Sequence, residues 1–349
     1  DDDIGPDMFG RAGDRRAAGD EAVHCRMGRD GREDVVQNGA LQRSQIPFRR
    51  LQQSGAAGPV HPAVAVVRDP FRARRRLPQH VREVPRLAHR DVRERLQRRR
   101  HEHLAGQGQL TVRIAYNLFT QRPKQELEDF ERWTDMLKPG QGTDFYRANG
   151  AGEMLVFSAA DFEDFLQPRP DLPEGMEDEL ERVVRHLVEH RWPFRLHATY
   201  DESISRMLDV FEKVNRDIPF NGLHWFFDHA ETITERNIER VKALGGGIAV
   251  QHRMVFQGEY FVDRYGKEAV KHTPPVAKML ALDVPVGLGT DATRVASYNP
   301  WTALYWLVSG RTVGGMAMYD DENRLPRDVA LELWTAGSAW FSSEQGKKG

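Results

Sequence analysis

From residue 106 onward, strand-like apolar stretches alternate with helical patterns, and this alternation limits the possible folds more than any other feature. Strands that alternate with helices predict a parallel sheet with helical crossovers. An open doubly wound sheet and a (β/α)8 barrel both agree with the six strands that we count. These expected strands span residues 111–119, 144–149, 192–198, 222–227, 247–250 and 284–288.

The helical patterns fill the intervals between these strands and follow the last one. Pro123 opens the first of them, and the pair Pro139-Gly140 ends it. In the second helix, apolar residues recur three and four apart, as on the buried face of an amphipathic helix. The expected helices span residues 123–138, 173–191, 201–215, 231–244, 273–281, 300–308 and 326–339.

Polar side chains at the ends of four consecutive strands decide between the two folds. His197 ends one strand, His229 lies just past the next, and His252 and Asp291 follow the last two. Their spacings of 32, 23 and 39 residues each correspond to about one strand–helix unit. In a barrel, the carboxyl ends of all strands converge on one face, where the active site is built. Imidazole nitrogens and a carboxylate there suit a catalytic divalent metal.

Each of these residues also has a structural interpretation. A single histidine at a strand end is more often a hydrogen-bonded structural residue than a ligand, and Asp291 could cap the turn after its strand. Buried on an apolar strand without partners, however, a histidine or aspartate would be costly to desolvate. Four such residues on successive units favour one shared site.

Two other histidine pairs have spacings known from metal sites. His186 and His190 lie four apart on a predicted helix, but Leu187 stands where a zinc protease has its catalytic glutamate. The sequence His101-Glu102-His103 follows a run of arginines rather than an apolar strand. We therefore expect neither pair to bind the metal.

Residues 1–105 differ sharply from the rest of the chain, and we treat 1–105 and 106–349 as separate parts. The front part has no Lys, Trp, Tyr or Thr, and its 22 Arg against 15 acidic residues give a net charge of +7. The remainder carries a net charge of −9. The front could be a disordered basic arm that binds nucleic acid, or a small helical domain. Its composition favours a third interpretation, a GC-rich coding region read out of frame.

The composition of the whole chain excludes several classes of protein. A net charge of −2 gives no electrostatic reason to expect nucleic acid or an anionic membrane as a partner. A single cysteine, Cys25, excludes an internal disulfide framework, and no apolar run approaches the roughly 20 residues that span a bilayer. The chain begins with three aspartates, without Met or a signal segment, so we expect a fragment of a cytoplasmic protein.

Three segments together resemble the amidohydrolase superfamily, in particular its YtcJ-like branch, amidohydrolase family 3. They are Phe194-Arg195-Leu196-His197-Ala198, Phe227-Asp228-His229-Ala230-Glu231 and Gly287-Leu288-Gly289-Thr290-Asp291-Ala292, which are similar to the fifth, sixth and eighth strands of that family. The stretch 330–340 resembles the family as well. The resemblance covers about residues 106–349 and implies a metal-dependent (β/α)8 barrel, of which strands three to eight are present.

The resemblance also implies a set of roles. His197 and His229 match the metal-binding histidines, and Asp291 matches an aspartate that binds metal and takes a proton from the hydrolytic water. His252 stands where the family often has a substrate-contacting histidine, and we expect it to act in catalysis. The implied cofactor is one or two divalent ions, in the first place Zn²⁺. The implied reaction is hydrolysis of a non-peptide C–N bond in an amide or cyclic amide, with a small molecule as substrate.

The departures from the family pattern bear on activity. The first two strands and the His-x-His of the first strand should lie within 1–105, where nothing resembles them. The fourth strand lacks the metal-bridging lysine, although Glu153 just beyond it could supply a carboxylate. We therefore expect the parent protein to be a hydrolase and this polypeptide to be nearly inactive. The alternatives are a degenerate barrel that binds a small molecule without catalysis, or a basic-arm interaction protein; homo-oligomer formation stays open.

Overall fold

The computed structural model describes residues 98–120, 122–162, 164–292 and 296–347. The chain separates into two units, Asp1–Arg76 and Leu77–Gly349, and all described residues belong to the second. The expectations for residues 1–97 therefore lie outside the described residues. The last residues of the Arg-rich part are described, and residues 98–106 form a helix.

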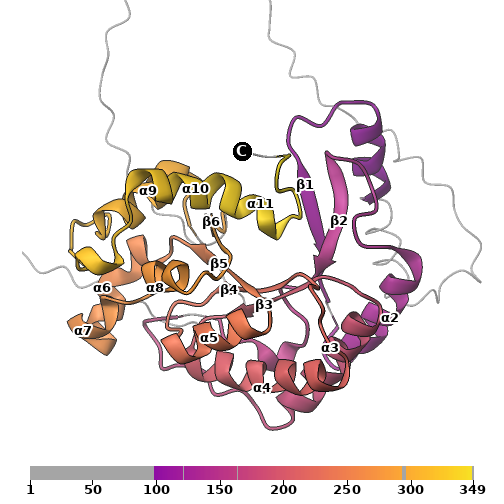
Figure 1. Cartoon of the computed structure of the whole chain (residues 1–349), viewed down its shortest axis with the longest axis horizontal. Helices are drawn as coiled ribbons and strands as arrows, with labels where there is room; N and C mark the ends of the chain where they lie inside the picture. The colour runs from indigo at the N-terminus through magenta and orange to yellow at the C-terminus, as the bar shows by residue number, and fades with distance from the viewer. Residues whose placement is uncertain (1–97, 121, 163, 293–295, 348–349) are drawn as a thin grey trace, which may run out of the picture. The chain divides into compact units, whose positions relative to one another are not determined.

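Six parallel strands form one sheet, and each strand pairs with its neighbour in the sequence. The sheet curls, so that β1 and β2 stand at a steep angle to β3–β5 (Figure 1). Sequential parallel order with helical crossovers is the pattern of a barrel, which confirms the predicted incomplete (β/α)8 fold. The strands are β1 Ile114–Leu118, β2 Tyr146–Ala151, β3 Phe194–Ala198, β4 Trp225–His229, β5 Gly247–Gln251 and β6 Val286–Gly289.

The helices follow the strands as predicted, with two differences. Residues 254–270 form two helices where the sequence analysis expected none, and the expected helix 326–339 is interrupted by a π-helical turn, η4 Leu333–Gly337. Two short 3-10 turns are η2 Phe157–Ala159 and η3 Asp321–Asn323. The α-helices are α2 Glu126–Met136, α3 Met176–Glu189, α4 Asp201–Asp217, α5 Glu235–Ala243, α6 Met254–Tyr265, α7 Lys267–Val270, α8 Val276–Ala281, α9 Pro300–Ser309, α10 Arg327–Glu332 and α11 Ser338–Phe341.

Aromatic side chains fill the space between the sheet and the helices on its outer side. Phe194 of β3 and Trp225 and Phe227 of β4 surround Phe211 of α4, with ring centroids 5.1–5.7 Å from that of Phe211. All four rings are buried. Every residue of β4 is buried, as expected for a parallel strand that is covered on both faces. This packing holds β3 and β4 against α4.

The C-terminal segment links the last strand to the first two. Helix α11 contacts β6, and the Asn149 side chain of β2 donates a hydrogen bond to the carbonyl of Phe341 at 2.9 Å. The buried Glu344 carboxylate lies 3.5 Å from Arg113 and from Arg147. In Figure 1 the end of α11 accordingly faces β1 and β2 across the curled sheet.

None of the helices in the described ranges is long and apolar enough to cross a membrane.

Candidate metal centre

Three side chains that can bind a metal meet at the carboxyl ends of β2, β3 and β4. Glu153 follows β2, His197 lies in β3, and His229 is the last residue of β4. One ligand atom from each lies within 4.8 Å of the other two. Parallel pairing of the strands brings these positions together, because Ala198 is the partner of His229 across β3 and β4. The resulting group is called the Glu153–His197–His229 cluster below.

The position of Glu153 depends on the main chain around Gly152. Gly152 has a φ of +102°, and a Cβ atom there would lie 1.9 Å from the carbonyl oxygen of Arg195. The Gly152 N–H donates to the carbonyl of Leu118 at 2.7 Å, and the His197 N–H donates to the carbonyl of Glu153 at 3.0 Å. Because only glycine accommodates this close approach, the sequence after β2 places the Glu153 carboxylate beside His197.

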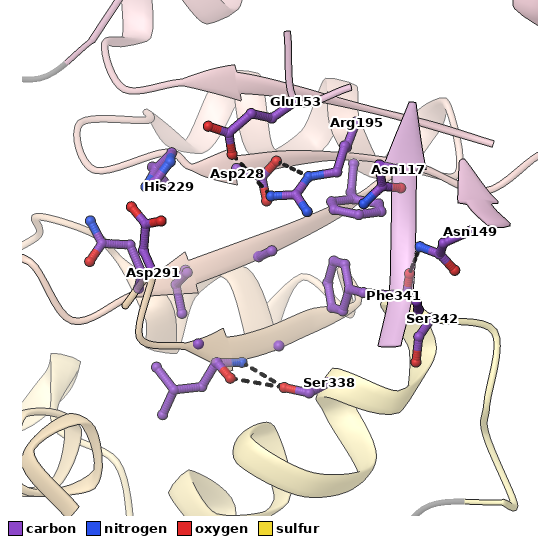
Figure 2. Close-up of a pocket in the computed structure, with 18 residues that line it drawn as sticks. Asn117, Asn149, Glu153, Arg195, Asp228, His229, Asp291, Ser338, Phe341 and Ser342 are labelled. Carbon is purple, nitrogen blue, oxygen red and sulfur yellow. Dashed lines mark hydrogen bonds and ion pairs between the residues drawn. The ribbon is translucent and has the colours of Figure 1, made fainter. Parts of the chain in front are cut away.

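Arg195 joins two carboxylates inside the curled sheet. Its Nη2 lies 3.0 Å from Glu153 Oε2, and its Nε lies 2.6 Å from Asp228 Oδ2 (Figure 2). The guanidinium also lies over the ring of Phe226, at 5.5 Å from its centroid. Burial disfavours the Glu153 carboxylate, but His197 and Arg195 outweigh that effect and lower the pKa of Glu153 to about 2. Burial raises the pKa of Asp228 to about 6 although Arg195 opposes the shift.

The two histidines of the cluster have opposite electrostatic environments. Their ring centroids are 4.3 Å apart, and His197 Nδ1 lies 3.7 Å from Glu153 Oε1. Burial lowers the pKa of His197, but the carboxylates of Glu153 and Asp161 outweigh burial and raise it. Burial and the neighbouring His197 hold the pKa of His229 well below its usual range. His229 is therefore neutral at neutral pH, the form in which imidazole binds a metal.

A cavity of about 290 Å³ opens beside this cluster. Glu153 and His229 line it, together with Arg195, Asp228 and the predicted site residue Asp291. In Figure 2, the side chains of Glu153, His229 and Asp291 lie around the same space. The structure thus brings Glu153 after β2, His229 at the end of β4 and Asp291 after β6 to one cavity. His252 is not among the lining residues.

Asp291 and His252 occupy different positions relative to the cluster. Asp291 follows β6 with a φ of +51°, and its Oδ2 lies 3.6 Å from Nη2 of Arg253. Burial and the nearby Glu153 raise the pKa of Asp291, although Arg253 opposes the shift. His252 is buried after β5, with its ring edge-on to Phe256 at 5.2 Å. Metal binding by Asp291 and catalysis by either residue stay predictions.

The donor set fits a divalent ion of the zinc type. Two imidazoles and one carboxylate are ligands that Zn²⁺ takes in catalytic sites, where a fourth position stays open. His229 Nδ1 is buried and makes no hydrogen bond within the described part of the chain. Glu153 supplies the carboxylate that the sequence analysis suggested in place of a lysine.

The other histidine pairs do not contribute to a comparable group. Residues 101–103 lie in the helix 98–106, and the ring of His101 lies 5.3 Å from that of Tyr146. His186 Nε2 of α3 lies 2.8 Å from Thr134 Oγ1 of α2, and His190 is exposed. Neither pair belongs to a group of three metal-binding side chains among the described residues.

Sequence reasoning missed the charged residues that surround the cluster. Arg195 was detectable, because it lies two residues before His197 and therefore on the same face of a strand. Asp228 directly precedes His229 on β4, and adjacent residues on a strand point to opposite faces, so its contribution could not be foreseen. Glu231 lies two residues beyond His229, after the strand has ended, where strand periodicity gives no prediction. Asp161 lies in a loop, where no periodicity reveals a buried carboxylate.

Comparison with known families agrees with this geometry. A model described as the amidohydrolase family matches residues 87–349, which are 263 of the 349 residues. The chain belongs to the amidohydrolase family. The match begins 19 residues before position 106, where the change in composition suggested a boundary.

Solved structures support the amidohydrolase fold. An uncharacterized metal-dependent hydrolase from Pyrococcus furiosus is 20% identical with a TM-score of 0.52, and the match covers 70% of this chain and 49% of that one. A similarly described protein from Pyrococcus horikoshii OT3 is 21% identical with a TM-score of 0.52, covering 69% and 48%. The chain thus spans about half the length of these two hydrolases. No curated protein matches the chain.

Proposed function

We propose that the protein represented by this chain is a metal-dependent hydrolase that cleaves a non-peptide C–N bond in an amide or cyclic amide. The observation that carries the proposal is the Glu153–His197–His229 cluster, which lies at the carboxyl ends of consecutive parallel strands beside a cavity. Membership of the amidohydrolase family supports the reaction class. The proposed substrate is a small molecule.

The three cluster residues would hold the ion. When bound, Zn²⁺ would lower the pKa of water from 15.7 to about 7 and polarise a carbonyl group. Glu153 would contribute a negative charge, because its lowered pKa keeps it ionised at neutral pH. His229 would contribute a neutral nitrogen, since its pKa lies far below neutrality.

Asp291 is the proposed general base. Its carboxylate lines the cavity and is half-exposed, so a water molecule can reach it. Burial and Glu153 raise its pKa and make it a better proton acceptor than an ordinary aspartate. Asp291 would take a proton from the attacking water and return it to the leaving nitrogen. Arg253, 3.6 Å away, would restrain the carboxylate.

The part of the chain described here supplies three ligands, and the first-strand histidines of the family were not found in the sequence. We therefore propose that this polypeptide binds metal but turns over amides slowly or not at all. A small-molecule-binding barrel without catalysis is the second candidate. The missing histidines favour it.

Metal analysis tests the proposal directly. We expect about one divalent ion per chain in the purified protein by plasma mass spectrometry, and loss of that ion in His197→Ala and His229→Ala. His190→Ala is the matched control, because His190 is exposed directly after α3 and its loss should leave the metal content unchanged. A wild-type chain that is folded by circular dichroism, yet binds no added Zn²⁺, would overturn the proposal.

A further inference from the structure

We infer that Asn117 and Arg195 form a second polar subsite in the cavity, which binds an uncharged polar group of the substrate at the end away from the metal position. The inference deepens the proposed function and rests on it for the amide that is hydrolysed. It assigns a substrate class: a small uncharged amide that carries a second amide or a hydroxyl group.

The cavity extends from the cluster across the curled sheet to β1. His229 at the end of β4 and Asp291 after β6 line it, and so does Asn117 of β1. The strands β1 and β6 are the opposite edges of the sheet. In Figure 2, Asn117 accordingly lies across the space from His229 and Asp291. A ligand that places one amide at the cluster therefore extends toward Asn117.

Asn117 presents an unbonded amide to this cavity. Its side chain makes no hydrogen bond to any residue that the structure describes. Ala115 and Asn117 both line the cavity, whereas Tyr116 between them stacks on Tyr146, as the alternation of a strand requires. Asparagine is depleted in strands, and a half-buried amide is costly unless it is hydrogen-bonded. Because an amide both donates and accepts, Asn117 suits an amide or a hydroxyl of the ligand.

Arg195 adds a hydrogen-bond donor to the subsite but no uncompensated positive charge. Its Nε and Nη2 donate to Asp228 and Glu153, and its Nη1 makes no hydrogen bond within the described part of the chain. Three carboxylates line the cavity against this one guanidinium, the third being that of Asp291. A carboxylate on the ligand would be repelled by these like charges. The subsite therefore fits an uncharged oxygen acceptor.

The remaining wall of the cavity limits the size and polarity of the ligand. Phe226, Leu288 and Phe341 line it with apolar surface. At about 30 Å³ for each water molecule, a cavity of about 290 Å³ accommodates on the order of ten non-hydrogen atoms. The expected substrate is therefore a short molecule with an apolar middle and a polar group at each end.

Three matched probes test the inference on metal-free protein at pH 7.5. Glutaramide carries an amide at each end of a short carbon chain, pentanamide has a methyl group in place of one amide, and glutaramate has a carboxylate there. Titrations followed by ligand-observed NMR give the dissociation constants. We expect glutaramide to bind about 3- to 10-fold more tightly than pentanamide, because it makes one additional hydrogen bond, and more tightly than glutaramate.

Two variants of neighbouring residues on β1 assign the preference to the subsite. Asn117→Leu removes the amide at nearly the same volume and should abolish the preference for glutaramide over pentanamide. Tyr116→Phe is the matched control, because it removes a polar group from the opposite face of the same strand and should retain the preference. If Asn117→Leu is not folded by circular dichroism, Asn117→Ala makes the same test with less bulk.

The outcomes separate the inference from the proposed function. Equal affinities of wild type for glutaramide and pentanamide, or no binding of glutaramide, overturn the inference, and so does a preference that persists in folded Asn117→Leu. Loss of the preference in Tyr116→Phe as well would assign it to the shape of β1, and tighter binding of glutaramate would contradict an uncharged ligand. If wild type shows the preference but binds no Zn²⁺, the subsite holds and the proposed function fails.

Discussion

Two arginines of this protein each bridge two carboxylates, one inside the curled sheet and one on the outer helices. Arg195 holds Glu153 and Asp228, and Arg240 of α5 holds Glu212 and Asp209 of α4 at 2.7 and 2.6 Å. The inner carboxylates are 28% and 7% exposed, whereas the outer ones are 35% and 69% exposed.

This difference shows which charges serve the site. The side chain of Arg240 is 14% exposed, but its two carboxylates are open to water, where ion pairs contribute little and can be replaced. The Arg195 bridge removes charges from bulk water, which costs free energy unless every group is paired. It also keeps Glu153 ionised and close to His197. Titratable groups with shifted pKa values, such as Glu153 and Asp228, cluster at functional sites.

Replacing each arginine with methionine should give the largest measurable difference between the Arg195 bridge and the Arg240 bridge. Arg195→Met should lower the free energy of unfolding by about 3 to 5 kcal/mol, because it leaves Glu153 and Asp228 without their shared partner. Arg240→Met should cost about 1 kcal/mol or less. Urea unfolding at pH 7 measures both. Equal losses of unfolding free energy in the two variants would show that burial of the carboxylates does not increase the cost of removing their arginine.

A pair of glycines extends the comparison to the backbone. In Gly152→Ala, the new Cβ would meet the Arg195 carbonyl at 1.9 Å, so the main chain that carries Glu153 must move. We expect a loss of about 3 kcal/mol and a reduced content of bound metal. Gly266→Ala, between α6 and α7, also has a positive φ of +88° but no atom within 4 Å of its Cβ position.

Gly266→Ala should therefore cost only the backbone strain, about 1 to 3 kcal/mol for a φ of +88° with a ψ of 166°, and leave the metal content unchanged. Metal analysis, with urea unfolding to confirm the fold, distinguishes the two variants. If both lost the metal, or neither did, the placement of Glu153 would not depend on the close approach at Gly152.

The sequence predicted the framework of this site because strand periodicity and strand ends are local signals. All six strands were found within a few residues of their expected positions, and His197 and His229 lie together as their spacing suggested. The predicted helix 326–339 is present but is interrupted at η4, directly before Ser338, whose Oγ bonds to the main chain of Leu288 on β6. Such a tertiary contact leaves no periodic signal.

The charges that surround His197 could not be predicted from the sequence, for a physical reason. The raised pKa of His197 depends on Asp161, 36 residues earlier in a loop, and on Glu153, whose place depends on the approach at Gly152. These are contacts in space that no spacing encodes. Helix α6 was missed because its segment contains Gly258 and few charged residues, so its pattern was not recognised as a helix.

The smallest expected effect compares a histidine of the cluster with one on the outer helices. Burial and the neighbouring His190 lower the pKa of His186, whereas Glu153 and Asp161 raise that of His197. NMR titration of metal-free protein should therefore place the His197 midpoint above 6.5 and the His186 midpoint below it. The reverse order would contradict the contrast between the two regions.

The two shifts have opposite consequences for stability. A lowered pKa in the folded state means that the unfolded chain binds the proton first, so the contribution of His186 is present above pH 6.5 and is lost as the pH falls through the folded value. The contribution of His197 is present below pH 6.5 and is lost as the pH rises through its raised value. His186→Gln should accordingly gain stability relative to wild type between pH 7.5 and pH 5, measured by urea unfolding at both values. A relative loss over this range would mean that the imidazole on α3 is stabilised as a cation, as His197 is, and that the outer helices do not differ from the cluster in this respect.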